Sequence, residues 1–193
     1  MNYKLAFVVL FYFVLIQSCK TAGNKVVNTE ESEAEFIETE IAECASCDLI
    51  GEISRAELVN NSTFNQWFST NYEAYQFNAL AMETLKSVST ENISFKIILG
   101  TWCSDSHRDV PRFTKILDAI NIQENVIEYY ALDVNKLSPE GIENTYNIIQ
   151  VPTFIVYKNG VELNRIVEMS VRTLEEDLAT ILTTNDYKNV YAD

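Results

Sequence analysis

The sequence is short of positive charge. Its 193 residues include 14 lysines and arginines against 28 aspartates and glutamates, which gives a formal net charge of −14. A surface of this sign repels the phosphates of nucleic acids and the headgroups of anionic lipids. We therefore exclude nucleic acids as partners, and we exclude anionic lipid surfaces as partners of the folded part of the chain.

The sequence also lacks internal repeats, and its N-terminal apolar run is short. This run, from Leu5 to Ile16, is too short for a comfortable bilayer span but suits the apolar region of an export signal. It follows Lys4 and ends in Ile16-Gln17-Ser18-Cys19. Hydrophobic residues make up 47% of the whole sequence, which is ordinary for a globular protein and permits a real core.

The end of the export signal resembles the bacterial lipobox, in which an apolar residue, a spacer and a small residue precede a cysteine. The resemblance implies cleavage before Cys19 and a lipid group on its sulfur. The other interpretation is an ordinary secretion signal in which Cys19 happens to lie near the cleavage site. We expect a lipid-anchored protein of the cell envelope that faces the periplasm, with the choice of inner or outer membrane left open.

Composition divides the chain into four segments. Residues 1–18 are the signal, 19–48 an acidic tether, 49–91 a helical extension packed on the domain, and 92–186 the main domain. Seven glutamates crowd the tether between residues 30 and 43, and like charges keep such a segment extended. We expect a solvated spacer with no binding role.

The helical extension carries two clear signals. Ser54 and Glu57 have the spacing of a capping box, which marks a helix start. Further on, aromatic residues recur at intervals of three and four, which predicts one helix face; they are Phe64, Trp67, Phe68, Tyr72 and Tyr75. We expect this aromatic stripe to pack against the main sheet rather than to form a ligand site.

From residue 93 the pattern predicts the order β-α-β-α-β-β-α. The expected elements are a strand at 93–99, a helix at 104–120, a strand at 126–133, a short helix after Ser138, strands at 153–157 and 161–167, and a helix after Thr173. Asn159-Gly160 is a strong hairpin signal, and the first two strands must be parallel with a right-handed crossover. The predicted fold class is α/β, with a mixed central sheet flanked by helices.

The most informative motif follows the first of these strands. Trp102-Cys103 lies at the turn from strand to helix, where free amides and the helix dipole stabilise a thiolate. A dithiol enzyme would carry a second cysteine three residues later, and this chain has Ser106 there. We take Cys103 as the candidate nucleophile and expect the Ser106 hydroxyl to donate a hydrogen bond to its sulfur.

Over about residues 92–184 these features resemble the thioredoxin family. The matching residues are Trp102-Cys103, Pro111 eight positions after the cysteine, Gln150-Val151-Pro152-Thr153, and Lys158-Asn159-Gly160. The resemblance implies a thioredoxin-like fold with a cis bond before Pro152, beside the sulfur. It also implies that Trp102, Val151 and Pro152 contact an extended substrate peptide. A looser resemblance is to thioredoxin-like lipoproteins.

Two departures from the family pattern bear on mechanism. Ser106 replaces the second active-site cysteine, and Ile97 stands where many members place a buried acid. In a dithiol enzyme the second thiol expels the first from a mixed disulfide, and a serine cannot do so. The chain therefore looks like a monothiol Cys-x-x-Ser variant.

Charged neighbours of Cys103 have opposing effects. Asp105 disfavours a thiolate, as would Glu168 if it lies nearby, whereas Arg108 and His107 favour one. His107 lies one helical turn from the cysteine on the same face. The alternative for His107 is an exposed helix residue without a role in the site.

Cys44 and Cys47 form a Cys-x-x-Cys pair at the end of the tether. An odd number of cysteines remains once Cys19 carries lipid, so at least one sulfur has no internal partner. The pair forms a local disulfide by default. It could instead be a second redox pair that resolves Cys103, or could supply zinc ligands together with Cys103 and His107. We expect no metal and no cofactor.

The sequence predicts thiol–disulfide exchange by a single cysteine. Cys103 would form mixed disulfides with exported proteins or peptides that contain cysteine, and an external thiol or dithiol reductant would release it. If the protein is an enzyme, it is of the thiol-disulfide oxidoreductase or isomerase type. The alternative is a non-catalytic thioredoxin-fold module that binds peptides or proteins at the membrane.

Overall fold

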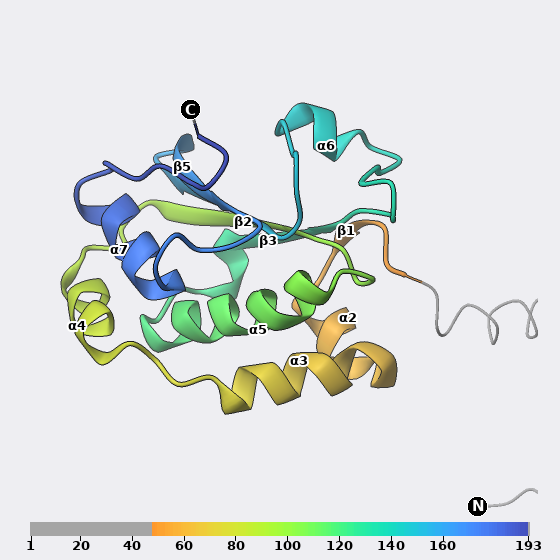
Figure 1. Ribbon diagram of the computed structural model, residues 1–193, viewed down its shortest axis with the longest axis horizontal. Coiled ribbons are helices and arrows are strands. Elements are labelled where there is room, and N and C mark those ends of the chain that lie inside the picture. Colours follow the sequence, from red (N-terminus) through yellow and green to blue (C-terminus); the bar gives the residue numbers. More distant parts are fainter. Residues whose placement is uncertain (1–47, 193) are drawn as a thin grey trace, which may run out of the picture. The chain divides into compact units, whose positions relative to one another are not determined.

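A mixed five-stranded sheet forms the centre of the computed structural model, which describes residues 48–192 (Figure 1). In spatial order the strands are β1 (Gly51–Ile53), β3 (Ile127–Ala131), β2 (Ile93–Leu99), β4 (Thr153–Lys158) and β5 (Val161–Val167). β2 and β3 are parallel, and the other neighbouring pairs are antiparallel.

Most helices lie on one side of this sheet, and one short helix lies on the other side (Figure 1). They are α2 (Arg55–Asn60), α3 (Ser62–Ala74), α4 (Ala79–Ser87), α5 (Ser104–Ala119), α6 (Ile142–Thr145) and α7 (Leu174–Thr183), with a short 3-10 turn, η2 (Glu124–Val126). From β2 onward the chain follows the order predicted from its sequence. The expected α/β class and thioredoxin-like fold are confirmed, and the helices of the extension, α2 to α4, lie between β1 and β2 in the chain.

The central strand β2 is apolar along one face and, at its C-terminal end, on both faces, which suits a place in the middle of the sheet. Side chains alternate along a strand, so Phe95, Ile97 and Leu99 face one side and Ile98 the other. Ile97, Ile98 and Leu99 are all fully buried. A strand of this composition needs cover on both sides, and the connections on either side provide it.

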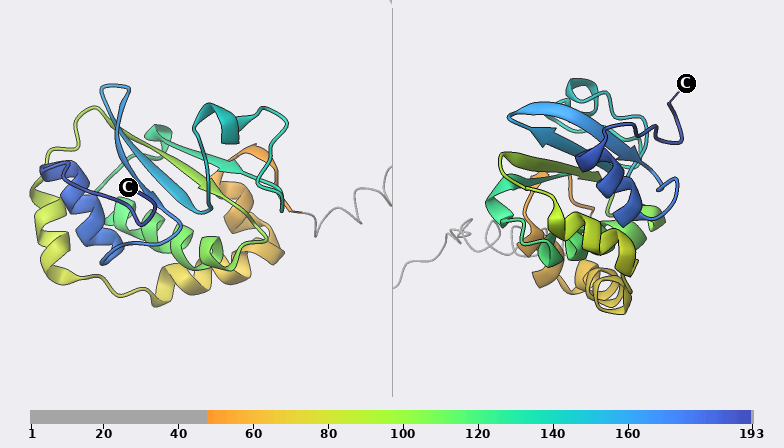
Figure 2. Two further views of the ribbon diagram at one scale, coloured as in Figure 1. Left: turned by 45° about the horizontal axis from the view of Figure 1, so that its top comes forward. Right: turned by 90° about the vertical axis from the view of Figure 1, so that its left-hand side faces the viewer.

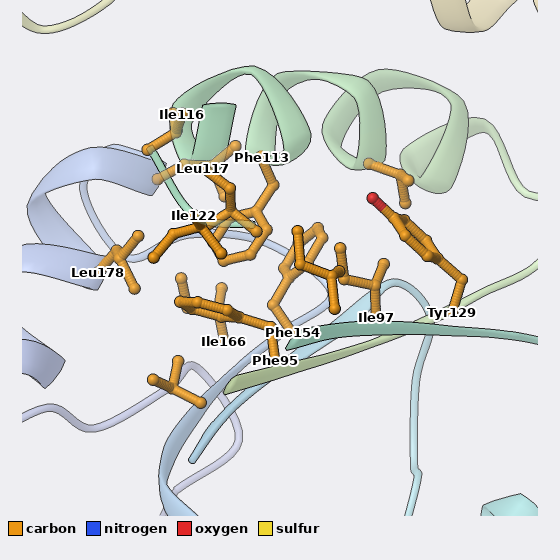
Figure 3. Close-up of a cluster of buried hydrophobic side chains, with 14 of the residues drawn as sticks. Phe95, Ile97, Phe113, Ile116, Leu117, Ile122, Tyr129, Phe154, Ile166 and Leu178 are labelled. Atoms are coloured by element: carbon orange, nitrogen blue, oxygen red, sulfur yellow. The ribbon is translucent and has the colours of Figure 1, made fainter. Parts of the chain in front are cut away.

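Helix α5 covers the larger core, as Figure 3 shows. Its Phe113 stacks on Phe154 of β4, with ring centroids 4.3 Å apart, and meets Phe95 edge to face at 6.0 Å. Ile116 and Leu117 point from the same helix toward the sheet. This packing fixes the position of α5, and with it the position of the residue that begins the helix.

The aromatic stripe does not pack directly on the sheet, contrary to the expectation from sequence. Helix α3 packs against α5, because α5 already occupies the adjacent face of the sheet (Figure 2). Lys115 of α5 donates hydrogen bonds to the carbonyl oxygens of Glu73 and Tyr75, at 3.1 and 2.9 Å. Arg55 and Asp118 add an ion pair of 2.7 Å between α2 and α5. The extension therefore forms a further layer outside α5.

One strand has no counterpart in the sequence prediction. The segment expected to begin the helical extension contains β1, which pairs with β3 through Gly51 and Ala131. Three residues are too few to show a strand period, and only the partner strand identifies them. Within residues 48–192, no helix has both the length and the apolar character needed to cross a membrane.

Replacement of Phe113 by alanine tests how strongly the position of α5 depends on this core. Phe113 is fully buried between two other rings, so we expect Phe113→Ala to lower the free energy of unfolding by about 3–5 kcal/mol. Urea unfolding measures this change. Leu80→Ala is the control, because Leu80 is 76% exposed and its loss should change stability by less than about 0.5 kcal/mol. Equal effects of the two substitutions would contradict this account of the core.

Candidate functional site

Cys103 lies where the central strand turns into helix α5. It is the residue that caps α5, and its side chain makes no capping hydrogen bond. Its amide donates to the Gly100 carbonyl, and its own carbonyl accepts from the His107 amide, both at 3.0 Å. The cysteine is thus held by its backbone, while its half-buried thiol forms no disulfide within residues 48–192.

The Cys103 sulfur lies beside the loop that precedes β4. Its thiol donates a hydrogen bond of 3.5 Å to the carbonyl oxygen of Val151. The peptide bond between Val151 and Pro152 is cis. Two segments 48 residues apart in the chain therefore meet at the sulfur.

An open cavity of about 380 Å³ gives access to this sulfur. Around Cys103 it is lined by Trp102, Ser104, Asp105, Lys136, Gln150, Val151 and Glu168. The sulfur is therefore neither sealed in the interior nor remote from the loop before Pro152. A thiol that is half-buried at the edge of a cavity is accessible to a partner molecule.

Trp102 forms one wall of the cavity, and its indole is anchored. Its Nε1 donates a hydrogen bond of 2.9 Å to the carbonyl oxygen of Leu132. Gly100 makes room for the ring, because a Cβ at Gly100 would lie 2.7 Å from the indole atoms Nε1 and Cε2. The absence of a side chain at Gly100 thus allows Trp102 to reach its partner.

Ser106 takes part in the turn rather than in a bond to the sulfur. It is fully buried, and its Oγ accepts a hydrogen bond of 3.2 Å from the Gly100 amide. Within residues 48–192, no hydrogen bond joins Ser106 to Cys103, although sequence reasoning expected one. The hydroxyl satisfies a backbone donor that would otherwise be buried without a partner.

His107 connects the helical extension to the turn. Its ring stacks on Trp67 of α3, with centroids 4.4 Å apart and planes inclined by 12°. Its Nε2 lies 2.5 Å from the Thr101 carbonyl oxygen, and since a carbonyl only accepts, Nε2 carries the hydrogen. His107 is therefore not an exposed helix residue. Sequence reasoning missed the role of Trp67, for which its place in the aromatic stripe was the only signal.

The guanidinium of Arg108 binds two carboxylates and not the Cys103 thiol. It donates to Asp109 and to Asp105, each with a contact of 2.6 Å. The hydrogen bond to Asp109, with the charge of Asp105, raises the pKa of Arg108 above its ordinary value. The carboxylate of Asp105 is in turn compensated by Arg108, which reduces its effect on the neighbouring cavity.

Glu168 and Lys136 place further charges at the cavity. The Glu168 amide donates to the Pro152 carbonyl at 2.7 Å, and its carboxylate accepts a hydrogen bond from the Tyr191 hydroxyl. This bond to Glu168 raises the pKa of Tyr191. Lys136 donates to the side-chain oxygen of Gln150. Tyr191 lies beyond residue 186, where sequence reasoning ended the domain, so the domain's contacts extend further.

The start of the described chain is also bound at the turn. Thr101 donates from Oγ1 to the Asp48 carboxylate at 2.8 Å, and the same oxygen accepts from the Leu49 amide at 3.1 Å. Asp48, the last residue of the expected tether, is thus bound to Thr101, which lies two residues before Cys103. Cys19, Cys44 and Cys47 lie outside the described residues. From residue 48 to 192, no group of three or more His, Cys, Asp or Glu side chains is arranged to hold a metal ion.

Comparison with known proteins yields only remote likenesses. No family model matches the chain, and no curated protein matches it. A protein of unknown function from Pseudomonas aeruginosa is 16% identical with a TM-score of 0.46, over 70% of this chain and 82% of its own. Trxlp from Edwardsiella tarda is 17% identical with a TM-score of 0.35, over 56% and 95%. A Malassezia sympodialis thioredoxin is 25% identical with a TM-score of 0.30, over 40% and 64%. What the site does must be argued from its own geometry.

The contact between Gly100 and Trp102 can be tested by a double-mutant cycle. Gly100→Ala brings a methyl group against the indole, so we expect a loss of about 1–3 kcal/mol in the free energy of unfolding. In a Trp102→Ala background the ring is absent, and the same substitution should cost much less. Urea unfolding of the four proteins measures the difference. An equal cost in both backgrounds would show that the ring is not the constraint on Gly100.

Proposed function

We propose that this protein carries out thiol–disulfide exchange with a single active cysteine, Cys103. The observation that carries the proposal is the position of its sulfur, half-buried at the edge of a cavity, 3.5 Å from the Val151 carbonyl oxygen. The sulfur belongs to the residue that begins α5, a position at which reactive cysteines occur in proteins.

In the first step, a disulfide bond of the substrate is exchanged for a disulfide bond to Cys103. The Cys103 thiolate attacks one sulfur of a substrate disulfide, the substrate S–S bond breaks, and the other substrate sulfur leaves as a thiolate that takes a proton from water. The product is a mixed disulfide between Cys103 and the substrate. Ionisation of Cys103 also removes the donor from the Val151 carbonyl, which becomes free to accept from a substrate amide.

The second step needs a thiolate that Ser106 cannot supply. Either a thiol of the substrate itself attacks the substrate sulfur and expels Cys103 as a thiolate, or a thiol of an external reductant attacks the Cys103 sulfur and releases the substrate as a thiolate. In the second case another reductant thiol then attacks the reductant sulfur, frees Cys103 and leaves the reductant as a disulfide. Isomerisation follows in the first case and net reduction in the second. Trp102, Val151 and Pro152 border the place where the substrate chain would lie.

The cellular setting belongs to the same proposal. The signal-like N-terminus supports export and a lipid anchor at Cys19, with the domain facing the periplasm. Substrates would then be exported proteins or peptides that contain cysteines, in a compartment where disulfides persist.

A second candidate function is a non-catalytic module that binds peptides in the same cavity. The observation in its favour is Ser106, whose hydroxyl serves the backbone of the turn in place of a resolving thiol. The two candidates differ in one respect, since only exchange requires a covalent bond to Cys103.

Covalent trapping with a peptide disulfide separates them. In a Cys44→Ser/Cys47→Ser background a mixed disulfide should accumulate at Cys103, visible by mass spectrometry without reduction, and addition of Cys103→Ser should prevent its formation. Ser106→Cys restores a thiol at the usual position of the resolving cysteine, so its mixed disulfide should be short-lived and substrate reduction with an external dithiol should accelerate. If Cys103→Ser captures the same partners from membranes as the wild-type protein does, the binding module is correct and exchange is wrong.

We further propose that Cys47 can act as a resolving thiol for Cys103. Supporting this, the next residue in the sequence, Asp48, accepts a hydrogen bond from Thr101, two residues before Cys103. In the step envisaged, the Cys47 thiolate attacks the Cys103 sulfur, the substrate leaves as a thiolate, and a Cys47–Cys103 disulfide forms. The Cys47–Cys103 dithiol thereby passes two electrons to the substrate disulfide.

Two matched variants test this step. Each reduced chain, without Cys19, receives one equivalent of a small disulfide oxidant and is mapped as unreduced peptides. In Cys44→Ser we expect a Cys47–Cys103 link within one chain, at a rate independent of protein concentration. In Cys47→Ser we expect little linkage from Cys44 to Cys103, because Cys44 lies three residues further from Asp48. Equal linkage in the two variants, or only links between chains, would refute a special role for Cys47.

A further inference from the structure

A second cavity, separate from that of Cys103, gathers positive charge in an otherwise acidic protein. It has a volume of about 310 Å³ and lies where α5, the loop after β5 and the start of α7 meet. Three arginines line it, with one carboxylate between them; these residues are Arg108, Arg112, Arg172 and Asp109. The whole chain carries a net charge of −14, so this concentration of guanidinium groups runs against the composition.

Each of these arginines has a carboxylate partner, but the ionic contacts of Arg112 and Arg172 are long. Asp109, with its side chain 8% exposed, is shared between Arg108 at 2.6 Å and Arg112 at 3.5 Å. Arg172 reaches Asp177 only at 3.8 Å, and Asp177 is already bonded to the amides of its own loop. Arg112 therefore has one long ionic contact, to a carboxylate that a closer guanidinium already holds.

Arg112 also has a donor without an acceptor. Its Nε is buried and has no hydrogen-bond partner among residues 48–192. The guanidinium lies over the ring of Tyr75, 5.4 Å from its centroid, and the Tyr75 hydroxyl is fixed by a 2.9 Å bond to Glu175. The side chain is thus held in place with a donor unused, which is unfavourable unless an acceptor enters the cavity.

We propose that this cavity binds an oxyanion, and specifically the carboxylate of an acidic residue in the substrate peptide. A carboxylate matches the planar donors of a guanidinium and would satisfy the free Nε of Arg112. The identification of the occupant as substrate rests on the proposed exchange at Cys103, whereas binding of an oxyanion by itself does not.

The spacing along α5 connects the cavity to the thiol. Arg108 and Arg112 follow Cys103 by five and nine residues, which corresponds to a rise of about 7.5 and 13.5 Å along the helix. An extended peptide covers about 3.3 Å per residue, so an acidic side chain two to four residues from the substrate cysteine would reach the arginines. Asp105, which lies between the two cavities, is paired with Arg108 and does not oppose such a chain. The substrate class is therefore peptides with Asp or Glu two to four residues from a cysteine.

Paired probe peptides test the assignment. Each carries one cysteine blocked as a disulfide with a small thiol, and the two differ only by Glu or Gln three residues away. We expect the wild-type protein to form its Cys103 mixed disulfide about tenfold faster with the Glu peptide at constant ionic strength. Arg112→Gln should abolish this preference, so that the Glu and Gln peptides react at the same rate. Lys86→Gln, which removes an exposed charge on α4 away from the cavity, should keep the preference.

A second measurement separates the site from the chemistry. In Cys103→Ser protein, inorganic phosphate and acetate should raise the thermal unfolding temperature, and Arg112→Gln or Arg112→Lys should reduce that rise, since lysine lacks the Nε donor. Phosphate stabilisation without a peptide preference would overturn the substrate assignment and leave a site for a free anion. Neither effect in a folded wild-type protein would overturn the site itself. If Cys103 reacts with neither peptide while the Arg112-dependent stabilisation persists, the exchange function fails and the anion site stands.

Discussion

The packing of α5 against the central strand is the constraint on which the site depends. Phe113 is clamped between Phe95 and Phe154, so the helix cannot shift along the sheet without opening the core. The turn that contains Cys103 is the short connection from β2 to α5, so the positions of these two elements determine where it lies. The position of a half-exposed sulfur is thus set by buried aromatic rings some three turns away along the helix.

The helical extension acts on the same turn from outside the sheet. Trp67 stacks on His107, and His107 donates to the carbonyl of Thr101. The Thr101 hydroxyl in turn binds the chain that leads into β1, through Asp48. The residues before Cys103 are therefore held by segments that precede the thioredoxin-like part of the chain. The aromatic stripe, which the sequence suggested would only pack in the core, therefore also holds the turn that carries the thiol.

Net charge is a poor guide to the local chemistry of this protein. The chain has an overall excess of acid, yet arginines of α5 and of the loop before α7 gather around one cavity. Near the thiol, Asp105 is compensated by Arg108, and Glu168 accepts a hydrogen bond from Tyr191. The effect of each charged side chain on the thiol therefore depends on the side chain that it contacts. These side chains come from α5, the loop after β5 and the C-terminal segment.

By itself the sequence determined the order of the elements from β2 onward, the hairpin at Asn159-Gly160 and the place of Cys103 at a helix start. These features follow from local signals, because periodicity, caps and turn residues act within a few positions. Only the tertiary structure decided that β1 pairs with β3, that Ser106 binds a backbone amide, and that Arg112 keeps a buried donor for which residues 48–192 offer no partner. A pattern along one segment says which face is apolar or charged, but not which distant segment will meet it.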